Sequence, residues 1–357
     1  MSDFTLDKVA RNISEWLRGE GPMHEIVISS RIRLARNVAG RRFLSRADAD
    51  EREHIAEVAA TAVRKAPRLS GYMQIDVAAL DELHRRLLVE RRLISRQHAE
   101  ASGARRVAFA VDETSAVMIN EEDHLRIQVI RSGFRLDEAW DEINRIDDEL
   151  EDQLEFAFHP QYGYLTACPT NVGTGLRVSV MLHLPALRLT SELDKVVEAA
   201  KELRLAIRGL YGEGSDATGD FFQISNQITL GRSESEIIDD FRDQVIPRIV
   251  DFERAARQAL IDRRAIALDD KIFRAIGALK TARLMSSNEA LQCLSHVRMG
   301  LHTGRLQSID LTTLNELLLH TQPAHLQVLS EGRSLNGQER SELRAAMIRR
   351  RLGVSEN

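Results

Sequence analysis

Residues 29–37 have the sequence SSRIRLARN, in which arginines alternate with aliphatic residues. Successive side chains of a β-strand point to opposite faces, so Arg31 and Arg33 would share one face while the aliphatic residues face the core. Two guanidinium groups on one face repel each other unless an anion lies between them. The pattern therefore predicts a strand over residues 25–37 that carries either an anion site or a solvated row of arginines.

The rest of the chain divides into a mixed part and a helical part. Periodicity and turn residues predict helices at 4–18, 47–65, 81–101, 136–154, 191–210 and 233–263, and strands or a hairpin at 106–111, 116–120, 124–131, 156–167, 176–184 and 221–230. After residue 263 the strand signals disappear, and periodic leucines and arginines continue to the end. We therefore expect one domain at 1–263 and a smaller, all-helical domain at 264–357.

The composition is that of a folded protein of enzyme size. The chain has 357 residues, of which 43% are hydrophobic, and its 49 basic and 54 acidic residues give a net charge of −5. Cys168 and Cys293 lack the spacing of a disulfide framework or a zinc site. Neither a signal peptide nor a membrane-spanning run is recognisable. We expect a soluble, cytoplasmic protein with no membrane and no direct nucleic-acid partner.

A second polar segment, NEEDHLR at residues 120–126, lies between two expected strands. Three consecutive acids at a strand end are costly unless they are solvated or bound to cations. The segment is either a polar turn or a site in which carboxylates receive a cationic substrate and Arg126 receives an anion.

A third segment, CPTNVGTGLR at residues 168–177, precedes an apolar strand. Its glycines and hydrogen-bonding side chains suggest a loop whose backbone approaches a ligand, the alternative being a plain turn. The chain has no Walker loop, no GxGxxG fingerprint and no eukaryotic protein-kinase signature. The nucleotide-binding folds that those motifs define are therefore disfavoured.

Together with Arg208, the run YGEG at 211–214 and the run ISNQITLG at 224–231, these segments resemble the catalytic domain of the phosphagen (guanidino) kinases. The resemblance covers residues 25–263 and keeps the family's order and spacing of motifs. It implies an α+β fold in which an antiparallel sheet is flanked by helices, with the active site on the concave face of the sheet. It also implies ATP and Mg²⁺ as cofactors.

The resemblance assigns a set of arginines to the phosphates of ATP. They are Arg31, Arg33, Arg126, Arg177 and Arg208. Phosphoryl transfer spreads negative charge over the equatorial oxygens of the transferred group. Planar, permanently charged guanidinium groups hold several oxygens at fixed angles, so the expected work of these arginines is positioning and charge stabilisation.

By the same resemblance, the carboxylates of Glu122 and Glu213 would bind the guanidinium of the acceptor. One of the two would act as the general base, and the other would fix the orientation of the acceptor. An acceptor arginine is a poor nucleophile, because its pKa exceeds about 12 and its lone pair is delocalised. Glu121 resembles the acid that helps to hold Mg²⁺ through water. Cys168 matches the family's reactive cysteine, and a setting among arginines would favour its thiolate; the alternative is a small buried residue.

Within that family, the chain looks like the bacterial branch that phosphorylates arginine side chains in proteins. Only a short expected helix precedes Ser29, where small-molecule phosphagen kinases carry a longer helical domain, and the run QPAHLQ at 322–327 is similar to this branch. The branch implies protein substrates with exposed arginine, a homodimer, an activator protein, Clp-type protease machinery and a role in stress response and protein quality control. A free-arginine kinase and a non-catalytic phosphoarginine-binding adaptor are the alternatives.

Two arginine-rich segments have open interpretations. The branch carries a C-terminal phosphoarginine pocket, to which Arg340 and Arg344 would correspond, although Ser341 stands where an acid is expected. The alternative is ordinary surface charge on one helical face. The arginines within 81–101 are interspersed with acids, which favours a solvated face over a docking site for nucleic acid or an acidic protein.

Overall fold

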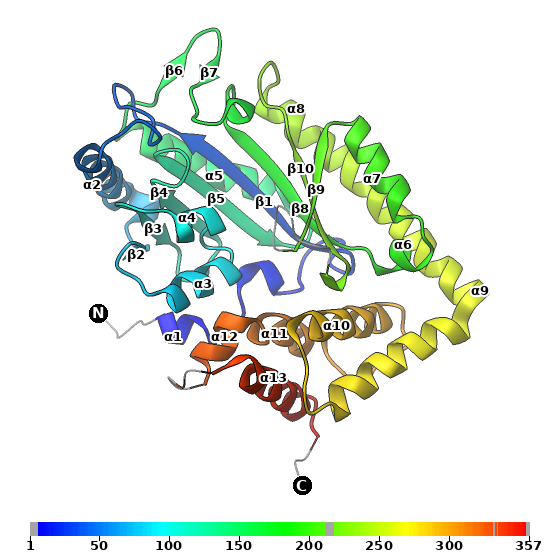
Figure 1. The fold of residues 1–357 in the computed structure, drawn as a ribbon. Helices are drawn as coiled ribbons and strands as arrows, with labels where there is room; N and C mark the ends of the chain where they lie inside the picture. The colour runs from blue at the N-terminus through cyan, green and yellow to red at the C-terminus, as the bar shows by residue number, and fades with distance from the viewer. Residues whose placement is uncertain (1–5, 211–217, 331–332, 334, 355–357) are drawn as a thin grey trace.

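The computed structural model describes residues 6–210, 218–330, 333 and 335–354. Within them the chain forms an antiparallel sheet with the strand order β2-β3-β4-β5-β1-β8-β10-β9 (Figure 1). The strands are β1 (Val27–Arg36), β2 (Met73–Asp76), β3 (Arg106–Phe109), β4 (Ser115–Ile119), β5 (Leu125–Ser132), β8 (Leu176–His183), β9 (Leu205–Gly209) and β10 (Phe221–Asn226). A separate hairpin pairs β6 (Phe158–His159) with β7 (Gly163–Tyr164). The expected antiparallel sheet is confirmed.

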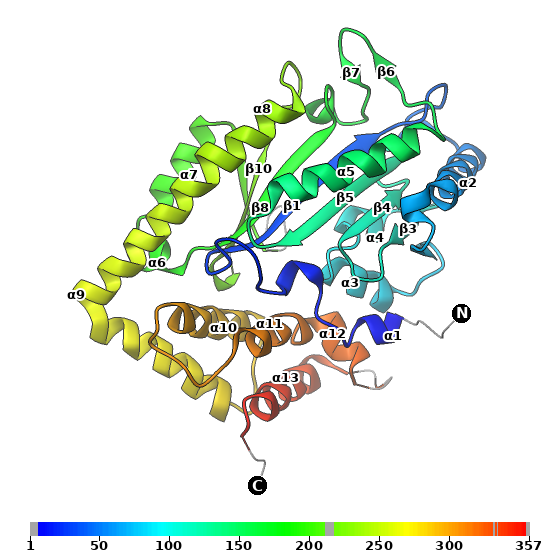
Figure 2. The same cartoon turned by 180° about the vertical axis from the view of Figure 1, so that it is seen from behind.

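The alternating pattern of β1 divides its side chains between two environments. Ile32 and Leu34 are buried, while Arg31 and Arg33 are half-buried on the other face. The helix α5 (Leu136–Glu151) packs across β1 and β5 and covers the aliphatic face, in front of the sheet in Figure 2. The arginine face is therefore turned away from α5.

Helices flank the sheet and make up the C-terminal part. They are α1 (Leu6–Val9), α2 (Ala49–Lys65), α3 (Glu82–Glu90), α4 (Arg96–Glu100), α6 (Pro185–Leu189), α7 (Leu193–Glu202), α8 (Glu234–Asp239), α9 (Ile246–Thr281), α10 (Ser287–His302), α11 (Leu311–His320), α12 (Pro323–Val328) and α13 (Gly337–Arg351). α9 extends past the end expected at residue 263, and its backbone leaves the helical conformation at Arg264 (φ −139°, ψ 32°). Among the described residues, no helix combines the length and the apolar character that a membrane crossing requires.

A second hydrophobic core joins the C-terminal helices to the sheet. Trp16, Leu17 and Met181 pack in one cluster with Leu294 of α10 and Leu318 of α11. Burying a large apolar side chain contributes about 1.5–3 kcal/mol, so this cluster holds the two parts together as one packed body. The C-terminal helices consequently lie beside the N-terminal segment and one end of the sheet (Figures 1 and 2).

Besides the helix expected at 233–263, which forms α8 and part of α9, three of the expected helices are wrong in extent. The helix expected at 81–101 is interrupted at Arg92, whose φ is 62°, and forms α3 and α4. The helix expected at 191–210 ends with α7, after which Arg204 (φ 54°) turns the chain into the edge strand β9. The stretch at 4–18 forms only α1 and one short 3₁₀ turn. A left-handed backbone at a residue other than glycine is uncommon, so neither interruption is visible in the composition.

Candidate active site

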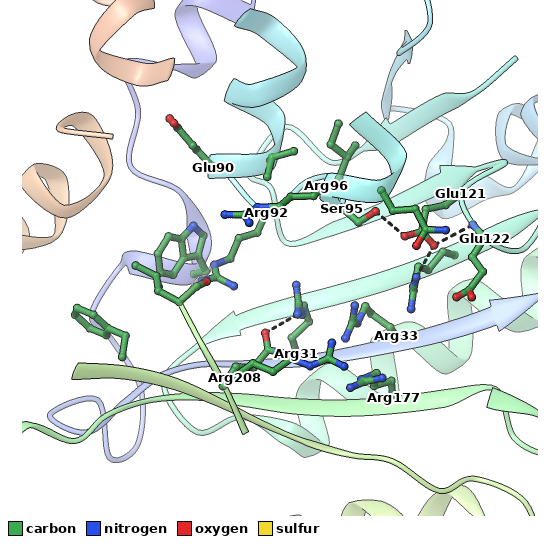
Figure 3. Close-up of a pocket in the computed structure, with 18 of the residues that line it drawn as sticks. Arg31, Arg33, Glu90, Arg92, Ser95, Arg96, Glu121, Glu122, Arg177 and Arg208 are labelled. Atoms are coloured by element: carbon green, nitrogen blue, oxygen red, sulfur yellow. Dashed lines mark hydrogen bonds and ion pairs between the residues drawn. The ribbon is translucent and has the colours of Figure 1, made fainter. Parts of the chain in front are cut away.

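The arginines that the sequence singled out lie on one face of the sheet (Figure 3). They are Arg31 and Arg33 on β1, Arg126 on β5, Arg177 on β8 and Arg208 on β9. Arg33 is directly opposite Arg177, and opposite residues of an antiparallel pair point to the same face. The registers of β1 with β5 and of β10 with β8 and β9 place the other members of the set on that face as well.

Neutral side chains orient two of these guanidinium groups. Arg31 Nη2 donates to Gln223 Oε1 at 2.7 Å, and Arg177 Nη2 donates to Ser225 Oγ at 3.0 Å. Arg33 forms no hydrogen bond or ion pair with the residues that the structure describes, and its Nε is buried. Arg33 therefore has donors available for a ligand in front of the sheet.

Burial and mutual repulsion both disfavour charge on the central arginines. The pKa of Arg31 and that of Arg33 lie well below the usual arginine value, first because burial removes water and then because neighbouring arginines repel them. Phosphate oxygens placed among these groups would replace the lost water and balance the charge. The cluster is therefore suited to a polyanion.

Arg126 differs from these arginines because it is paired with Glu121. Its Nη1 forms an ion pair with Glu121 Oε2, and Ser95 Oγ donates to Glu121 Oε1 at 2.5 Å. Burial by itself would raise the pKa of Glu121, but Arg126 and the hydrogen bonds lower it. Burial would likewise lower the pKa of Arg126, yet Glu121 raises it. Glu121 is thus an ionised carboxylate that orients Arg126.

Glu122 lies next to this ion pair and points into the cavity (Figure 3). Its carboxylate accepts no hydrogen bond from the described part of the chain. Burial raises the pKa of Glu122, and the attraction of Arg126 offsets this only in part. A carboxyl group with a raised pKa that faces a cavity is suited to proton transfer.

Asp123 connects three of the polar segments. Its Oδ1 accepts from Asn37 Nδ2 and from the backbone N–H of Ala167, both at 2.6 Å. The end of β1, the acidic turn and the loop after Ala167 therefore meet at one buried carboxylate. This role of Asp123 was not predicted from the sequence, although each of the three motifs contains or borders one of these residues.

Cys168 lines the cavity close to this junction. Its Sγ lies 3.0 Å from Thr170 Oγ1, within the short turn Pro169–Asn171. In the same loop Gly173 has a φ of 111°, and a Cβ there would lie 3.0 Å from the backbone of Leu230. This glycine therefore permits a close approach between two segments of the chain. Thr170 and Asn171 of the same loop line the cavity, and the approach of the loop backbone to a ligand stays a prediction.

The cavity has a volume of about 860 Å³ and lies between the arginine face of the sheet and helices α3 and α4 (Figure 3). The described site residues that the resemblance assigned to catalysis and nucleotide binding all line it. Glu213 lies outside the described residues. Arg92 also lines the cavity and Arg91 is buried, so the expectation of a solvated arginine face was wrong for both. The interruption between α3 and α4, which the sequence analysis missed, reorients these side chains.

The described residues contain no group of three or more acidic, histidine or cysteine side chains that would hold a metal ion by themselves. Magnesium usually keeps several waters and binds through one or two carboxylates plus substrate phosphates. The carboxylate of Glu121, beside the arginine cluster, fits that mode through a bridging water, as the resemblance implies. The cavity is therefore compatible with a magnesium ion that enters together with a nucleotide.

The two C-terminal arginines lie on α13 and are held by backbone carbonyls. Arg344 is buried and donates to Thr321 O at 2.8 Å and to Met285 O at 2.9 Å. Arg340 Nη1 donates to Leu335 O at 2.8 Å. Ordinary surface charge is excluded for Arg344 by its burial, and binding of a phosphoarginine at this pair stays a prediction.

Residues 54–256 match the family model described as ATP:guanido phosphotransferase, C-terminal catalytic domain. The chain therefore belongs to the ATP:guanido phosphotransferase family. Its fold resembles that of lombricine kinase, with 26% identity, a TM-score of 0.58, and coverage of 70% of this chain and 71% of that one. It also resembles the duplicated taurocyamine kinase of Schistosoma mansoni, with 24% identity, a TM-score of 0.60, and coverage of 66% and 34%.

Residues 265–357 match the model described as Protein-arginine kinase McsB C-terminal domain. A protein-arginine kinase of Halothermothrix orenii is 44% identical, with 98% of this chain and 99% of that protein covered. One of Symbiobacterium thermophilum is 47% identical, with 97% and 98% covered. Within its family, the chain is thus a member of the protein-arginine kinases, and it is a phosphotransferase.

Proposed function

We propose that this enzyme binds MgATP with its phosphates among the arginines of the sheet and transfers the γ-phosphoryl group to an arginine side chain of a protein. The observation that carries the proposal is the presence, in one cavity, of the arginine cluster and of Glu122, which faces that cluster without a hydrogen-bond partner among the described residues. The names of the relatives and the match of the C-terminal part support protein arginine as the acceptor.

In this proposal Arg31, Arg33, Arg177 and Arg208 bind phosphate oxygens. Arg126 does so in the orientation that Glu121 gives it. Magnesium, when bound, would neutralise part of the phosphate charge. The arginine cluster holds the γ-phosphorus close to the acceptor, so the enzyme contributes positioning and charge stabilisation and forms no covalent bond to the substrate.

The acceptor is itself a cation, so it needs carboxylates on its side of the cavity. We assign this role to Glu122 and Glu213, with Glu122 as the general base because of its raised pKa. An acceptor nitrogen forms a bond to the γ-phosphorus, the bond from phosphorus to the ADP oxygen breaks with its electron pair leaving on ADP, and the proton of the nitrogen passes to Glu122. Cys168, which lines the same cavity, would help to align the acceptor.

Several finer assignments belong to the same proposal. The break at Arg264 supports a division into domains 1–263 and 264–357. The exposed side chains of Ile266, Phe273 and Leu284 support a homodimer formed through the C-terminal part. Two free thiols fit the reducing cytoplasm. An activator protein, Clp-type protease machinery and a role in stress response rest on the family resemblance alone.

The proposal is tested by incubating the protein with MgATP and an arginine-containing protein and measuring acid-labile phosphate on the acceptor. Glu122→Gln and Glu213→Gln should each reduce transfer by at least about 100-fold, the usual scale for loss of a general base, with little change in the Kd for ATP. Arg145→Gln, on the exposed side of α5, is the control. Parallel loss of nucleotide binding would contradict the assigned roles, and phosphoarginine binding without any transfer would favour an adaptor.

A further inference from the structure

A second large cavity lies between α7 and the start of α9 (Figures 1 and 2). Its volume is about 910 Å³, which falls within the range of roughly 300–1,000 Å³ that is usual for small-molecule sites. Buried apolar side chains form part of its wall, among them Leu187, Val196, Phe241 and Ile249. The apolar part of a ligand would therefore leave water on entering this cavity, which favours binding.

Apolar side chains also surround the cavity on its exposed side. Leu203, Ile228 and Phe252 line it, and their exposed fractions are 62%, 37% and 57%. Single exposed apolar residues are normal on a protein surface, whereas several around one cavity indicate a surface that a ligand covers. The apolar surface thus continues from the buried wall to the exposed rim.

The helix that borders the cavity departs from α-helical geometry. Residues Asp240–Val245, between α8 and α9, form a π-helical segment. Phe241, Gln244 and Val245 of this segment line the cavity. π-helical turns are rare, and they occur frequently at functional sites. The unusual backbone therefore lies where the cavity is.

The charged side chains of this cavity leave an excess of positive charge. They are Lys195, Arg204, Arg232, Arg248, Glu192 and Asp240. Asp240 is paired with Arg232 at 2.6 Å. Glu192 is paired with Lys195 at 3.5 Å. Arg204 and Arg248 form no ion pair with any residue in the described ranges, so both guanidinium groups are available to an anion at the exposed rim.

The second cavity shares a wall with the cavity that holds the arginine cluster. Gln227 and Ile228 line both of them. Asn226, which precedes this wall, accepts from the backbone N–H of Val178 at 2.9 Å, next to Arg177 on β8. The side chain of Gln227 forms no hydrogen bond within the described part of the chain. A ligand on one side would restrict these side chains, so a ligand on the other side would meet a wall that is already ordered.

We infer that the second cavity binds an organic anion with an apolar body, a long-chain or aromatic carboxylate, whose charged end lies at Arg204 and Arg248. Because Gln227 and Ile228 belong to both cavities, its occupancy is linked to that of the arginine cavity. The binding of the anion goes beyond the proposed function and does not depend on it. The linkage rests on the proposed function, in which ATP occupies the arginine cavity.

Binding is tested with decanoate, which should displace the fluorescent apolar anion anilinonaphthalene sulfonate from the protein. Ala199→Trp places a large side chain in the cavity from an exposed position on α7. It should weaken decanoate binding at least about tenfold, because the apolar chain loses its buried surface. Ala267→Trp, at an exposed position of α9 outside the cavity lining, is the matched control and should bind decanoate like the parent. Equal affinity of the parent and Ala199→Trp would overturn the inference.

The role of charge is tested by comparing decanoate with decanol, which has the same chain and no charge. Arg204→Gln combined with Arg248→Gln should weaken decanoate binding about tenfold, the scale of a hydrogen bond to a charged group, and change decanol binding less than about twofold. Arg145→Gln on α5 should affect neither ligand. An unchanged affinity for decanoate, or equal weakening of both ligands, would overturn the assignment of the charged end.

Sedimentation velocity distinguishes a small ligand from a second copy of the chain. The parent and Ala199→Trp should have the same oligomeric state. Dissociation of Ala199→Trp alone would show that another copy fills the cavity, and it would overturn the inference.

Titration with and without MgATP tests the linkage. Saturating MgATP should tighten decanoate binding about fivefold, the lower end of the usual coupling between sites, and decanoate should tighten ATP binding by the same factor. Ile228→Ala removes one of the shared side chains and should reduce this factor below about twofold. An unchanged Kd for decanoate in MgATP would overturn the linkage. If the parent binds no ATP, the proposed function fails, and the decanoate titrations without nucleotide still decide whether the second cavity is a binding site.

Discussion

Arg33 of β1 lies directly opposite Arg177 of β8, with both side chains on the cavity face of the sheet. Like charges at opposite positions of neighbouring strands destabilise a sheet. A bound polyanion removes this repulsion, so the stability of the sheet and the occupancy of the cavity are thermodynamically linked. The folded protein is therefore less stable when the cavity is empty, and the relief of this repulsion adds to the affinity for a nucleotide.

Arg33→Ala should separate these two effects. It should weaken ATP binding by about 10- to 100-fold, because hydrogen bonds to charged groups contribute about 1.5–3 kcal/mol. Without nucleotide, the substitution should leave Tm unchanged or raise it, since it removes repulsion. Calorimetry with and without ATP measures both, and Arg145→Ala on α5 is the exposed control. A lower Tm in the absence of nucleotide would contradict the account.

The pH dependence of transfer should report on Glu122. Burial raises its pKa, so the fall in kcat on acidification should begin at a higher pH than an ordinary glutamate would give. Ionising a group whose folded pKa is raised costs stability, so Glu122→Gln should raise the free energy of unfolding at neutral pH and not below the ordinary glutamate pKa. A kcat that does not fall on acidification would exclude Glu122 as the base.

Glu121 should show the opposite linkage. Its folded pKa is lowered, so its contribution to stability is present at neutral pH and is lost as the pH falls through that pKa. Glu121→Ala leaves Arg126 without its buried partner and should cost about 3 kcal/mol of unfolding free energy at pH 7. Glu57→Ala, which removes exposed ion pairs, is the control. The account predicts a smaller loss for Glu121→Ala in acid, and an equal loss at both pH values would contradict it.

The two cysteines should react with iodoacetamide at different rates. Cys168 lines the cavity, whereas burial raises the pKa of the Cys293 thiol on α10. We expect Cys168 to be alkylated first and ATP to slow its modification. Mass spectrometry of partially labelled protein gives the order of modification. Cys293→Ser should leave unchanged the rate at which iodoacetamide abolishes phosphoryl transfer. Faster labelling of Cys293 would show that Cys168 does not face the cavity as described.

The sheet and its arginine face were predictable because side chains alternate with a period of two along a strand. SSRIRLARN defines two faces without knowledge of any partner, and the structure places Arg31 and Arg33 on the one that is not covered by α5. The family resemblance supplied the other arginines, which come from separate strands. A pattern within one segment does not reveal which segments become neighbours in the sheet.

The parts that sequence reasoning missed depend on unusual backbone or on distant pairs. Arg92 has a left-handed conformation that no glycine marks, so α3 and α4 appeared as one helix with a solvated face. The contact between Glu90 and His325 joins residues 235 positions apart. The acidic turn was expected to be solvated or to receive a cation, whereas Asp123 accepts hydrogen bonds from Asn37 and Ala167. Such long-range polar pairs leave no periodic trace in a single sequence.

The central claim is that the enzyme transfers the γ-phosphoryl group of ATP to an arginine side chain of a protein in this cavity. It is tested most directly by competition: MgATP is supplied with equal concentrations of an arginine-containing protein and of free arginine, and acid-labile phosphate is measured on each. The account predicts phosphorylation of the protein with little on free arginine, and loss of both signals in Glu122→Gln. Predominant phosphorylation of free arginine, or undiminished transfer by Glu122→Gln, would contradict it.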